Sequence, residues 1–291
     1  MKPAQARVLL TGATGGIGQA TAQALLRAGA AVLLVGRTEH TLADLSRRLV
    51  TQGHAASRVK WLQADITRAE DRQRLAAESA RLGCNVLLHG AGLPAFGALN
   101  TLPAGDVHAV LQTNLEAPML LTQALLPQLQ ALPRAQVIFL GSALGRMGLP
   151  GFSTYSASKF GLLGFAEALR RELAGTRVRV QYLGPRSTRT GFNAPAVSAY
   201  NRATGTAEDP PEVVAQAVVA MLASEAAERF LGFPEKLAVR LNALAPAWFD
   251  RVFRKHAAHL REAHAEPAIS AGSGLGAKTQ STAPASPLAR P

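Results

Sequence analysis

The residues from Thr11 to Gly18 constrain the fold more than any other part of the chain. They read TGATGGIG, follow the apolar run Val8–Leu10 and precede a sequence typical of a helix. Glycines permit a tight turn, close approach of the backbone to a pyrophosphate and close packing of the helix on a sheet, while the helix N-terminus supplies amide donors. A glycine-rich turn without a ligand is the alternative, but the strand–turn–helix context favours a dinucleotide-binding turn. We expect its residues to contact the cofactor: Gly12, Thr14, Gly15, Gly16, Ile17 and Gly18.

Short apolar runs alternate with longer helical patterns along most of the chain. Several runs are apolar almost throughout, as strands buried on both faces of a sheet require. The alternation predicts an α/β chain with a Rossmann-type, doubly wound parallel sheet in a single domain. Six strands are expected, at residues 7–11, 31–35, 58–63, 85–89, 136–141 and 178–183.

The composition changes near residue 235 and again near residue 266. Residues 236–265 mix large apolar and basic side chains, which predicts a C-terminal amphipathic helical extension of two pieces separated by Pro246. Residues 266–291 are rich in Ala, Ser, Gly, Pro and Thr, which predicts a disordered tail. The Rossmann-type domain is therefore expected over residues 1–235, and its long connection 186–210 is expected to cover a site.

Composition also limits the compartment. The chain has 291 residues, 48% of them hydrophobic, and a single cysteine, Cys84. One cysteine cannot form an internal disulfide, which fits a reducing compartment. No apolar stretch approaches the roughly 20 residues of a membrane-spanning helix, and no export signal is visible. We expect a cytoplasmic protein, peripheral to a membrane at most, and we expect no metal site.

A net charge of +12 suits partners that carry phosphate, whether a nucleotide, a nucleic acid or an anionic lipid. The basic residues are dispersed and no nucleic-acid motif is present, so we expect no nucleic-acid partner. In residues 237–260, Trp248, Phe249 and Phe253 are interleaved with Arg and Lys. This segment predicts weak contact with an anionic membrane surface, and dimer packing or covering of a pocket explains it equally well.

The end of the second expected strand bears on cofactor choice. An NAD site usually presents an acid about 20 residues after the glycines, to hold the ribose hydroxyls. Here the sequence reads Val35-Gly36-Arg37-Thr38, and no acid appears before Glu39. A guanidinium can pair with a 2′-phosphate, so Arg37 favours NADP(H) over NAD(H), with a solvated surface charge as the alternative.

Tyr155 and Lys159 lie four residues apart at the start of an expected helix, so both side chains share one face. A nearby cation stabilises phenolate and is expected to lower the pKa of Tyr155. Ser142 follows the fifth expected strand and therefore lies at the carboxyl edge of the sheet, where open α/β folds bind ligands. A tyrosine–lysine pair alone is common, and a lone serine there is usually a loop cap, but together they predict proton chemistry on a bound oxygen.

These residues resemble the short-chain dehydrogenase/reductase family, whose pattern is a TGxxxGxG turn, an Asn, a Ser and a YxxxK pair. The resemblance covers residues 7–232. It implies that Tyr155 is the general acid in carbonyl reduction and the base in alcohol oxidation. It further implies that Lys159 binds the nicotinamide ribose, that Ser142 orients the carbonyl and that Asn114 holds a water relaying protons to Lys159. The remaining cofactor contacts that it implies are Asp65, Ile66, Gly90, Ala91, Gly92, Asn114, Tyr155, Lys159, Pro185 and Thr190.

Two positions depart from the family pattern. His89 stands where the family usually has Asn before Asn-Ala-Gly, and we interpret it as a strand-end residue satisfying backbone groups, with a polar group near the cofactor as the alternative. Arg186 replaces the glycine after Pro185. It is expected to alter nicotinamide placement, to meet an acidic substrate group or to point into solvent.

The resemblance implies an NADP(H)-dependent oxidoreductase that reduces a carbonyl, or oxidises the corresponding alcohol, and that forms a homo-oligomer. An apolar pocket wall is expected, which indicates a small-molecule, acyl or ring-bearing substrate. The alternative is a non-catalytic nucleotide-sensing or scaffold protein of the same fold. The expected wall residues are Leu93, Phe96, Leu144, Met147, Leu149, Phe152 and the segment around Phe192.

Overall fold

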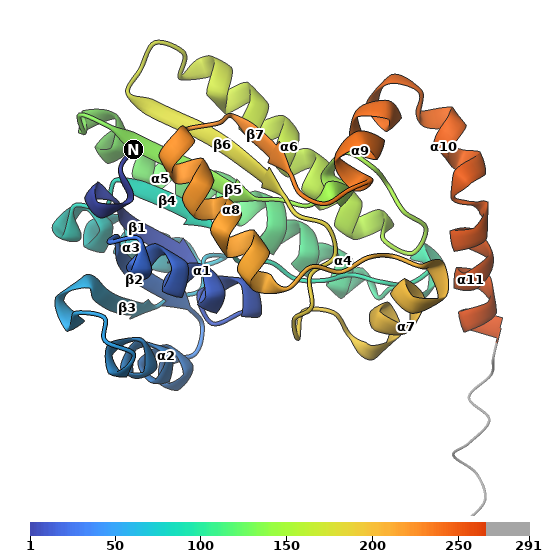
Figure 1. Ribbon diagram of the computed structural model, residues 1–291, viewed down its shortest axis with the longest axis horizontal. Coiled ribbons are helices and arrows are strands. Elements are labelled where there is room, and N and C mark those ends of the chain that lie inside the picture. The colour runs from blue at the N-terminus through green and yellow to red at the C-terminus, as the bar shows by residue number, and fades with distance from the viewer. Residues whose placement is uncertain (266–291) are drawn as a thin grey trace, which may run out of the picture.

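The computed structural model describes residues 1–265 and contains one sheet of seven parallel strands in the order β3-β2-β1-β4-β5-β6-β7 (Figure 1). This sheet confirms the predicted Rossmann-type fold class. The predicted tail, residues 266–291, lies outside the described residues. The strands are β1 (Arg7–Thr11), β2 (Ala31–Gly36), β3 (Val59–Gln63), β4 (Val86–His89), β5 (Ala135–Leu140), β6 (Val178–Gly184) and β7 (Glu228–Phe230).

Helices cover both faces of the sheet. Side chains of α1, α2 and α8 form one apolar core with the sheet, and those of α3, α5 and α6 form the other. Successive side chains of β1 alternate between the two cores, since Val8 and Leu10 lie in the first core and Leu9 lies in the second. This double burial explains why the strands are apolar almost throughout. The helices are α1 (Gly16–Arg27), α2 (Glu39–Thr51), α3 (Ala69–Leu82), α4 (Ala104–Leu111), α5 (Ala117–Ala131), α6 (Ser153–Glu172), α7 (Pro195–Thr204) and α8 (Pro211–Ser224).

The expectation of six strands was wrong by one. The missed strand, β7, has three residues, two of which are charged, and it pairs with β6 at the edge of the sheet. A strand this short at an edge needs no continuous apolar run, so it left no periodic signal. Before β5, the π-helical turn Gln112–Glu116 lies between α4 and α5.

The C-terminal extension contains three helices rather than the expected two: α9 (Glu235–Leu244), α10 (Pro246–Val252) and α11 (Arg254–Ala265). They stand beside α6 and α7, at the end of the molecule away from α2 and β3 (Figure 1). Val239 and Phe249 are buried against Ala143 and Met147 in a small third core. The extension therefore packs directly on the loop that follows β5. No helix within residues 1–265 is long and apolar enough to cross a membrane.

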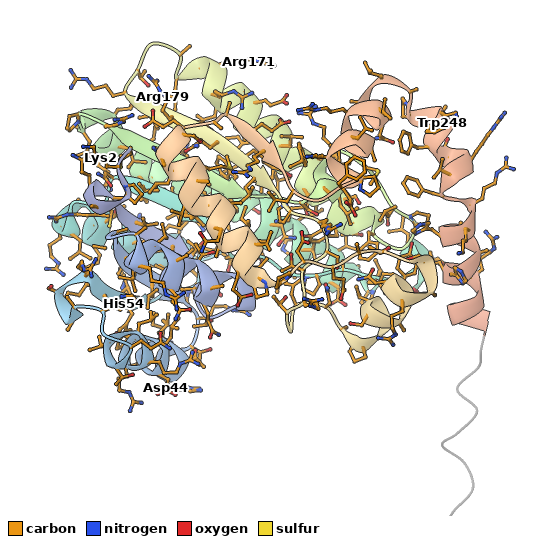
Figure 2. All side chains as sticks on the ribbon, viewed as in Figure 1. Lys2, Asp44, His54, Arg171, Arg179 and Trp248 are labelled. Carbon is orange, nitrogen blue, oxygen red and sulfur yellow. The ribbon has the colours of Figure 1, made fainter. Side chains whose placement is uncertain are left out.

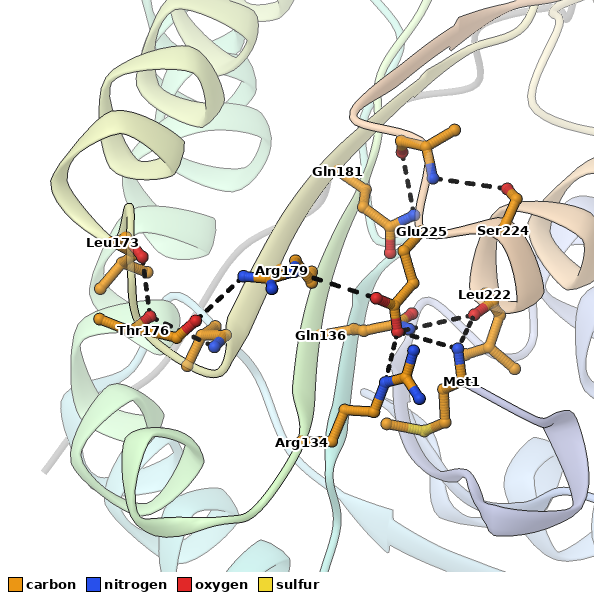
Figure 3. Close-up of polar contacts among 12 residues, drawn as sticks. Met1, Arg134, Gln136, Leu173, Thr176, Arg179, Gln181, Leu222, Ser224 and Glu225 are labelled. Carbon is orange, nitrogen blue, oxygen red and sulfur yellow. Dashed lines mark hydrogen bonds and ion pairs between the residues drawn. The ribbon is translucent and has the colours of Figure 1, made fainter.

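Glu225 makes several polar contacts near the amino ends of β5 and β6 (Figure 3). Its carboxylate accepts hydrogen bonds from the amino group of Met1 at 2.9 Å, from Arg134 Nε at 2.7 Å and from Gln136 Nε2 at 3.0 Å. The hydrogen bond from Arg134 is the main reason that the pKa of Glu225 falls to about 2, and those from Met1 and Gln136 add to it. The charged carboxylate therefore ties α8 to β5 and to the first residue.

We predict that Glu225→Gln lowers the free energy of unfolding by about 1–3 kcal/mol at neutral pH, since several donors lose a charged acceptor. The pKa of the folded carboxyl lies below its unfolded value, so the stabilisation is present above the unfolded pKa and is lost as pH falls toward about 2. Urea denaturation of wild type and variant between neutral and acid pH should show the difference shrinking. Glu172→Gln, at an exposed carboxylate of α6, is the control, and an equal loss there would contradict the assignment.

Candidate active site

A cavity of about 1190 Å³ opens at the carboxyl ends of the strands. The sheet order reverses between β1 and β4, which creates the crevice where open α/β sheets bind ligands. The cavity brings together all but one of the predicted cofactor and catalytic residues, the exception being Asn114. Its predicted lining residues are Gly12, Thr14, Gly15, Gly16, Ile17, Gly18, Arg37, Asp65, Ile66, Gly90, Ala91, Gly92, Ser142, Tyr155, Lys159, Pro185 and Thr190.

The glycine turn is pressed against the end of β4. Gly12 has φ +68°, and a Cβ there would lie 2.6 Å from the amide nitrogen of Ala91. A Cβ on Gly18 would lie 2.1 Å from the carbonyl oxygen of Gly12. The Thr11 hydroxyl accepts hydrogen bonds from the amides of Gly90 and Ala91 at 3.1 and 3.2 Å. The turn therefore leaves a trough free of side chains before the N-terminus of α1, which fits a dinucleotide pyrophosphate.

Two charged residues flank the cavity near β2 and β3. Arg37 is exposed, and its guanidinium forms no ion pair with another residue of the described part of the chain. Gln63 Nε2 holds the main chain there by donating to the carbonyl oxygen of Arg37 at 3.0 Å. Asp65 Oδ1 accepts from the amide and hydroxyl of Thr67 at 3.0 and 2.7 Å, and its second oxygen accepts no hydrogen bond from another residue within 1–265. Both residues thus lie on the same side of the cavity, as two contacts to the adenosine end of one dinucleotide require.

The chemistry-bearing residues meet at the end of β5. Tyr155 lies in the first turn of α6, where it lines the cavity together with Ser142. Lys159, one turn later, is buried, with Nζ 5.6 Å from the centre of the Tyr155 ring and 3.3 Å from the carbonyl oxygen of Leu140, to which it donates. A hydroxyl donor, a second hydroxyl and a cation therefore converge on one point of the cavity.

Burial controls the protonation of this group. Desolvation raises the pKa of Tyr155 to about 12 and lowers that of Lys159 to about 8, and the hydrogen bond from Ser142 offsets only part of the rise. The expected lowering of the Tyr155 pKa by Lys159 was therefore wrong. The ammonium is itself desolvated, so burial outweighs its effect. Tyr155 is protonated at neutral pH, the state that a proton donor needs.

The side chain of Asn114 binds the backbone of a neighbouring loop and does not line the cavity. It is fully buried in the π-helical turn, where its Oδ1 accepts from the Leu93 amide at 2.7 Å. Its Nδ2 donates to the Leu93 carbonyl oxygen at 2.9 Å and to Ser158 Oγ at 3.2 Å. These bonds join the loop after β4 to α6. The side chain therefore positions the backbone beside the cavity and does not itself line it.

Tyr182 is a positioning residue that the sequence did not reveal. Its buried hydroxyl accepts from the Ser142 amide at 3.1 Å and donates to the Ser142 carbonyl oxygen at 3.2 Å. A Cβ at Gly141 or Gly145 would lie within 2.2 Å of this side chain. Both glycines therefore make room for a phenol that holds the backbone of Ser142. A tyrosine inside an apolar strand carried no distinguishing signal, because most such residues are simply core.

The two departures from the family pattern have structural roles. His89 is buried, stacks on Phe139 at 4.9 Å and contacts the Thr122 hydroxyl at 2.8 Å, so it satisfies a side chain rather than the backbone groups that we expected. Desolvation lowers its pKa to about 3, which keeps it neutral. Arg186 neither points into solvent nor offers a free cation to a substrate. It pairs with Asp209 at 2.7 Å and Glu235 at 3.2 Å, and so joins the loop after β6 to α9.

The far end of the cavity is mainly apolar. Of the wall residues expected from the sequence, Phe96 does not line it but packs behind it on Phe152, with ring centres 4.9 Å apart. Val197 of α7 was missed, because its distance along the chain hides its proximity to the site. Phe249, Val252 and Phe253 belong to the segment 237–260, and their place on the wall agrees with the expected alternative that this segment covers a pocket. The expected residues on the wall are Leu93, Leu144, Met147, Leu149, Phe152 and Phe192, and the added ones are Val197, Phe249, Val252 and Phe253.

Fold and site together define an oxidoreductase of the dinucleotide-binding α/β class. The family model described as short chain dehydrogenase matches residues 6–201, and the chain belongs to this family. It is 32% identical over 268 residues to dehydrogenase/reductase SDR family member 7B of Bos taurus, covering 86% of this chain and 81% of that protein. A ketoacyl reductase of Nostoc is 28% identical over 85% of this chain and 88% of its own. A short chain dehydrogenase of Burkholderia cenocepacia, solved in complex with NADP, is 25% identical with a TM-score of 0.74 over 87% of this chain and 99% of its own.

We predict that Tyr182→Phe lowers kcat about tenfold while the KM for the nicotinamide cofactor changes little. The phenyl ring preserves the packing, but both backbone groups of Ser142 lose their buried partner, so the serine hydroxyl is held less firmly. Steady-state kinetics of wild type and variant provide the measurement, with thermal unfolding as the check on stability. An unchanged kcat would show that Tyr182 serves packing alone.

Proposed function

We propose that the chain is an NADP(H)-dependent oxidoreductase that reduces a carbonyl, or oxidises the corresponding alcohol, on a largely apolar substrate. The observation that carries the proposal is the convergence of Tyr155, Ser142 and Lys159 in the same cavity as the glycine turn. A dinucleotide bound along the turn extends toward these residues. The site then has a place for each reactant and a donor for the proton.

The mechanism assigns one task to each residue. The nicotinamide ring, when bound, supplies or accepts the hydride. Ser142 and Tyr155 donate hydrogen bonds to the carbonyl oxygen, and Tyr155 gives it the proton in reduction. Lys159 then stabilises the phenolate, because its buried ammonium lies near the ring.

The preference for NADP(H) rests on Arg37. Its guanidinium beside β2 forms no ion pair within residues 1–265 and can form charge-assisted hydrogen bonds with a 2′-phosphate, and no carboxylate at the end of β2 competes for a ribose hydroxyl. That the related Burkholderia dehydrogenase was solved with NADP supports this assignment.

The substrate assignment rests on the apolar wall. Leu149, Phe152 and Phe192 line the cavity beside Tyr155, and Phe249 and Phe253 extend the apolar surface away from it. Such a wall favours a substrate with an acyl chain or a ring attached to the carbonyl. The resemblance to a ketoacyl reductase agrees with an acyl substrate. A scaffold function is less well supported, since it gives no reason for the buried lysine beside the tyrosine.

The direct test combines cofactor titration with turnover. Purified protein is titrated with NADPH by fluorescence and then assayed with ketones, aldehydes and acyl carbonyls. We predict that Tyr155→Phe abolishes turnover and leaves the NADPH Kd nearly unchanged, since only the proton donor is removed. Wild-type protein that binds neither NADPH nor NADH would overturn the proposal and favour the scaffold alternative.

Arg37→Ala isolates the cofactor preference. Loss of a charge-assisted pair with the 2′-phosphate should weaken NADPH binding about tenfold or more and leave NADH binding unchanged. Arg47→Ala, at an exposed arginine of α2 outside the cavity, is the matched control. Equal effects on the two nucleotides would show that Arg37 does not read the 2′-phosphate.

A further inference from the structure

Exposed apolar side chains are concentrated on α9, α10 and the loop before them. Six of the thirteen exposed large hydrophobic residues of the described chain lie between positions 233 and 252. Leu244 is 83% exposed and Trp248 is 59% exposed, which is unusual for such large side chains. We call this set the α9–α10 face: Phe233, Leu237, Leu241, Leu244, Trp248 and Val252.

These residues form an exposed apolar stripe on each of the two helices. Leu237, Leu241 and Leu244 recur every three or four positions on α9, and Trp248 and Val252 lie four positions apart on α10, so each helix exposes one apolar side. The opposite side is occupied, because Val239 and Phe249 are buried in the third core. The stripe is therefore the outer side of helices whose inner side already packs on the protein. Figure 2 shows Trp248 at the end of the molecule opposite Asp44 and His54.

Basic side chains border the stripe. Arg240 lies three residues after Leu237 and four before Leu244, and Arg251 lies three residues after Trp248, so both arginines sit beside apolar members of the face. Neither forms an ion pair with another residue of the described chain, and the same holds for Lys236, Arg254 and Lys255.

The charges around the α9–α10 face favour an anionic bilayer over a second copy of the chain as its binding partner. On α9 and α10 the acidic residues are Glu235, already paired with Arg186, and Asp250. A second copy of the chain docked through the same face would set these cations against each other across a two-fold axis. An anionic bilayer presents the complementary charge, together with an apolar interior for Leu and a headgroup region that suits Trp.

The face also reaches the entrance of the active-site cavity. Val252 belongs to the exposed stripe and lines the cavity as well, and Phe249 and Phe253 on either side of it line the cavity too. An apolar path therefore runs from the outer surface of α10 toward Tyr155. A protein seated on a bilayer through this face would open its cavity next to the lipid.

We propose that the α9–α10 face binds the surface of an anionic phospholipid bilayer, with Leu244 and Trp248 entering the interface and Arg240 and Arg251 contacting lipid phosphates. This binding needs neither cofactor nor turnover, so it can be tested separately from the oxidoreductase activity.

The chain has two tryptophans, Trp61 and Trp248, which allows a site-specific readout. In the Trp61→Phe protein, the emission of Trp248 should shift to the blue on addition of vesicles of equimolar phosphatidylcholine and phosphatidylglycerol, and brominated lipid should quench it. The reciprocal Trp248→Phe protein, which reports from β3, should show neither change. Emission of Trp248 that stays unchanged with these vesicles would overturn the proposal.

Matched variants separate the apolar and the charged parts. Leu244→Glu and Arg240→Glu should each weaken vesicle co-sedimentation about tenfold. Leu99→Glu, at an exposed leucine outside the face, and Lys60→Glu, at an exposed lysine of β3, should leave it unchanged, and circular dichroism should show all four proteins folded. Equal binding to pure phosphatidylcholine would contradict the role of the arginines. A fall from dimer to monomer in Leu244→Glu without a change in vesicle binding would assign the face to a second copy and overturn the proposal.

Discussion

The double burial of the parallel sheet is the constraint on which the rest of the structure depends. Its strands carry apolar side chains into both cores, so polar side chains that act on a ligand are gathered where the strands end. Thr11, Ser142 and the turn of Gly12 all lie immediately after or at the end of a strand. The carboxyl ends of β1 and β4 thus border a crevice that can hold a dinucleotide on one side and a substrate on the other.

The precision of the site comes from buried polar residues that do not face the cavity. Asn114 holds the loop at Leu93 to α6, and Tyr182 holds the backbone of Ser142 through a hydroxyl that fits between two glycines. Burial has a second effect, because desolvation lowers the pKa of Lys159 and raises that of Tyr155. The phenol of Tyr155 is therefore protonated at neutral pH, and the ammonium of Lys159 stabilises it most when it loses its proton.

Local patterns predicted the fold class, the glycine turn and the grouping of Ser142, Tyr155 and Lys159, because each depends on residues close together in the chain. Contacts between distant segments escaped prediction. The role of Tyr182 requires knowledge of Gly145, and the position of Arg186 depends on Asp209 and Glu235. The direction of the Tyr155 pKa shift was mispredicted for the same reason, since spacing gives the distance to a cation but not the loss of solvent. β7 was missed because a short edge strand has no apolar period.

The most direct test of the central claim follows the hydride itself. NADPH deuterated at the transferable C4 position is incubated with the protein and an acyl or aryl ketone, and the product is analysed by mass spectrometry. The account predicts one deuterium on the carbinol carbon of the product. The contrary result is that no carbonyl class yields a labelled alcohol and the deuterium stays in the cofactor. That result would contradict the claim that Tyr155, Ser142 and Lys159 form a reductase site.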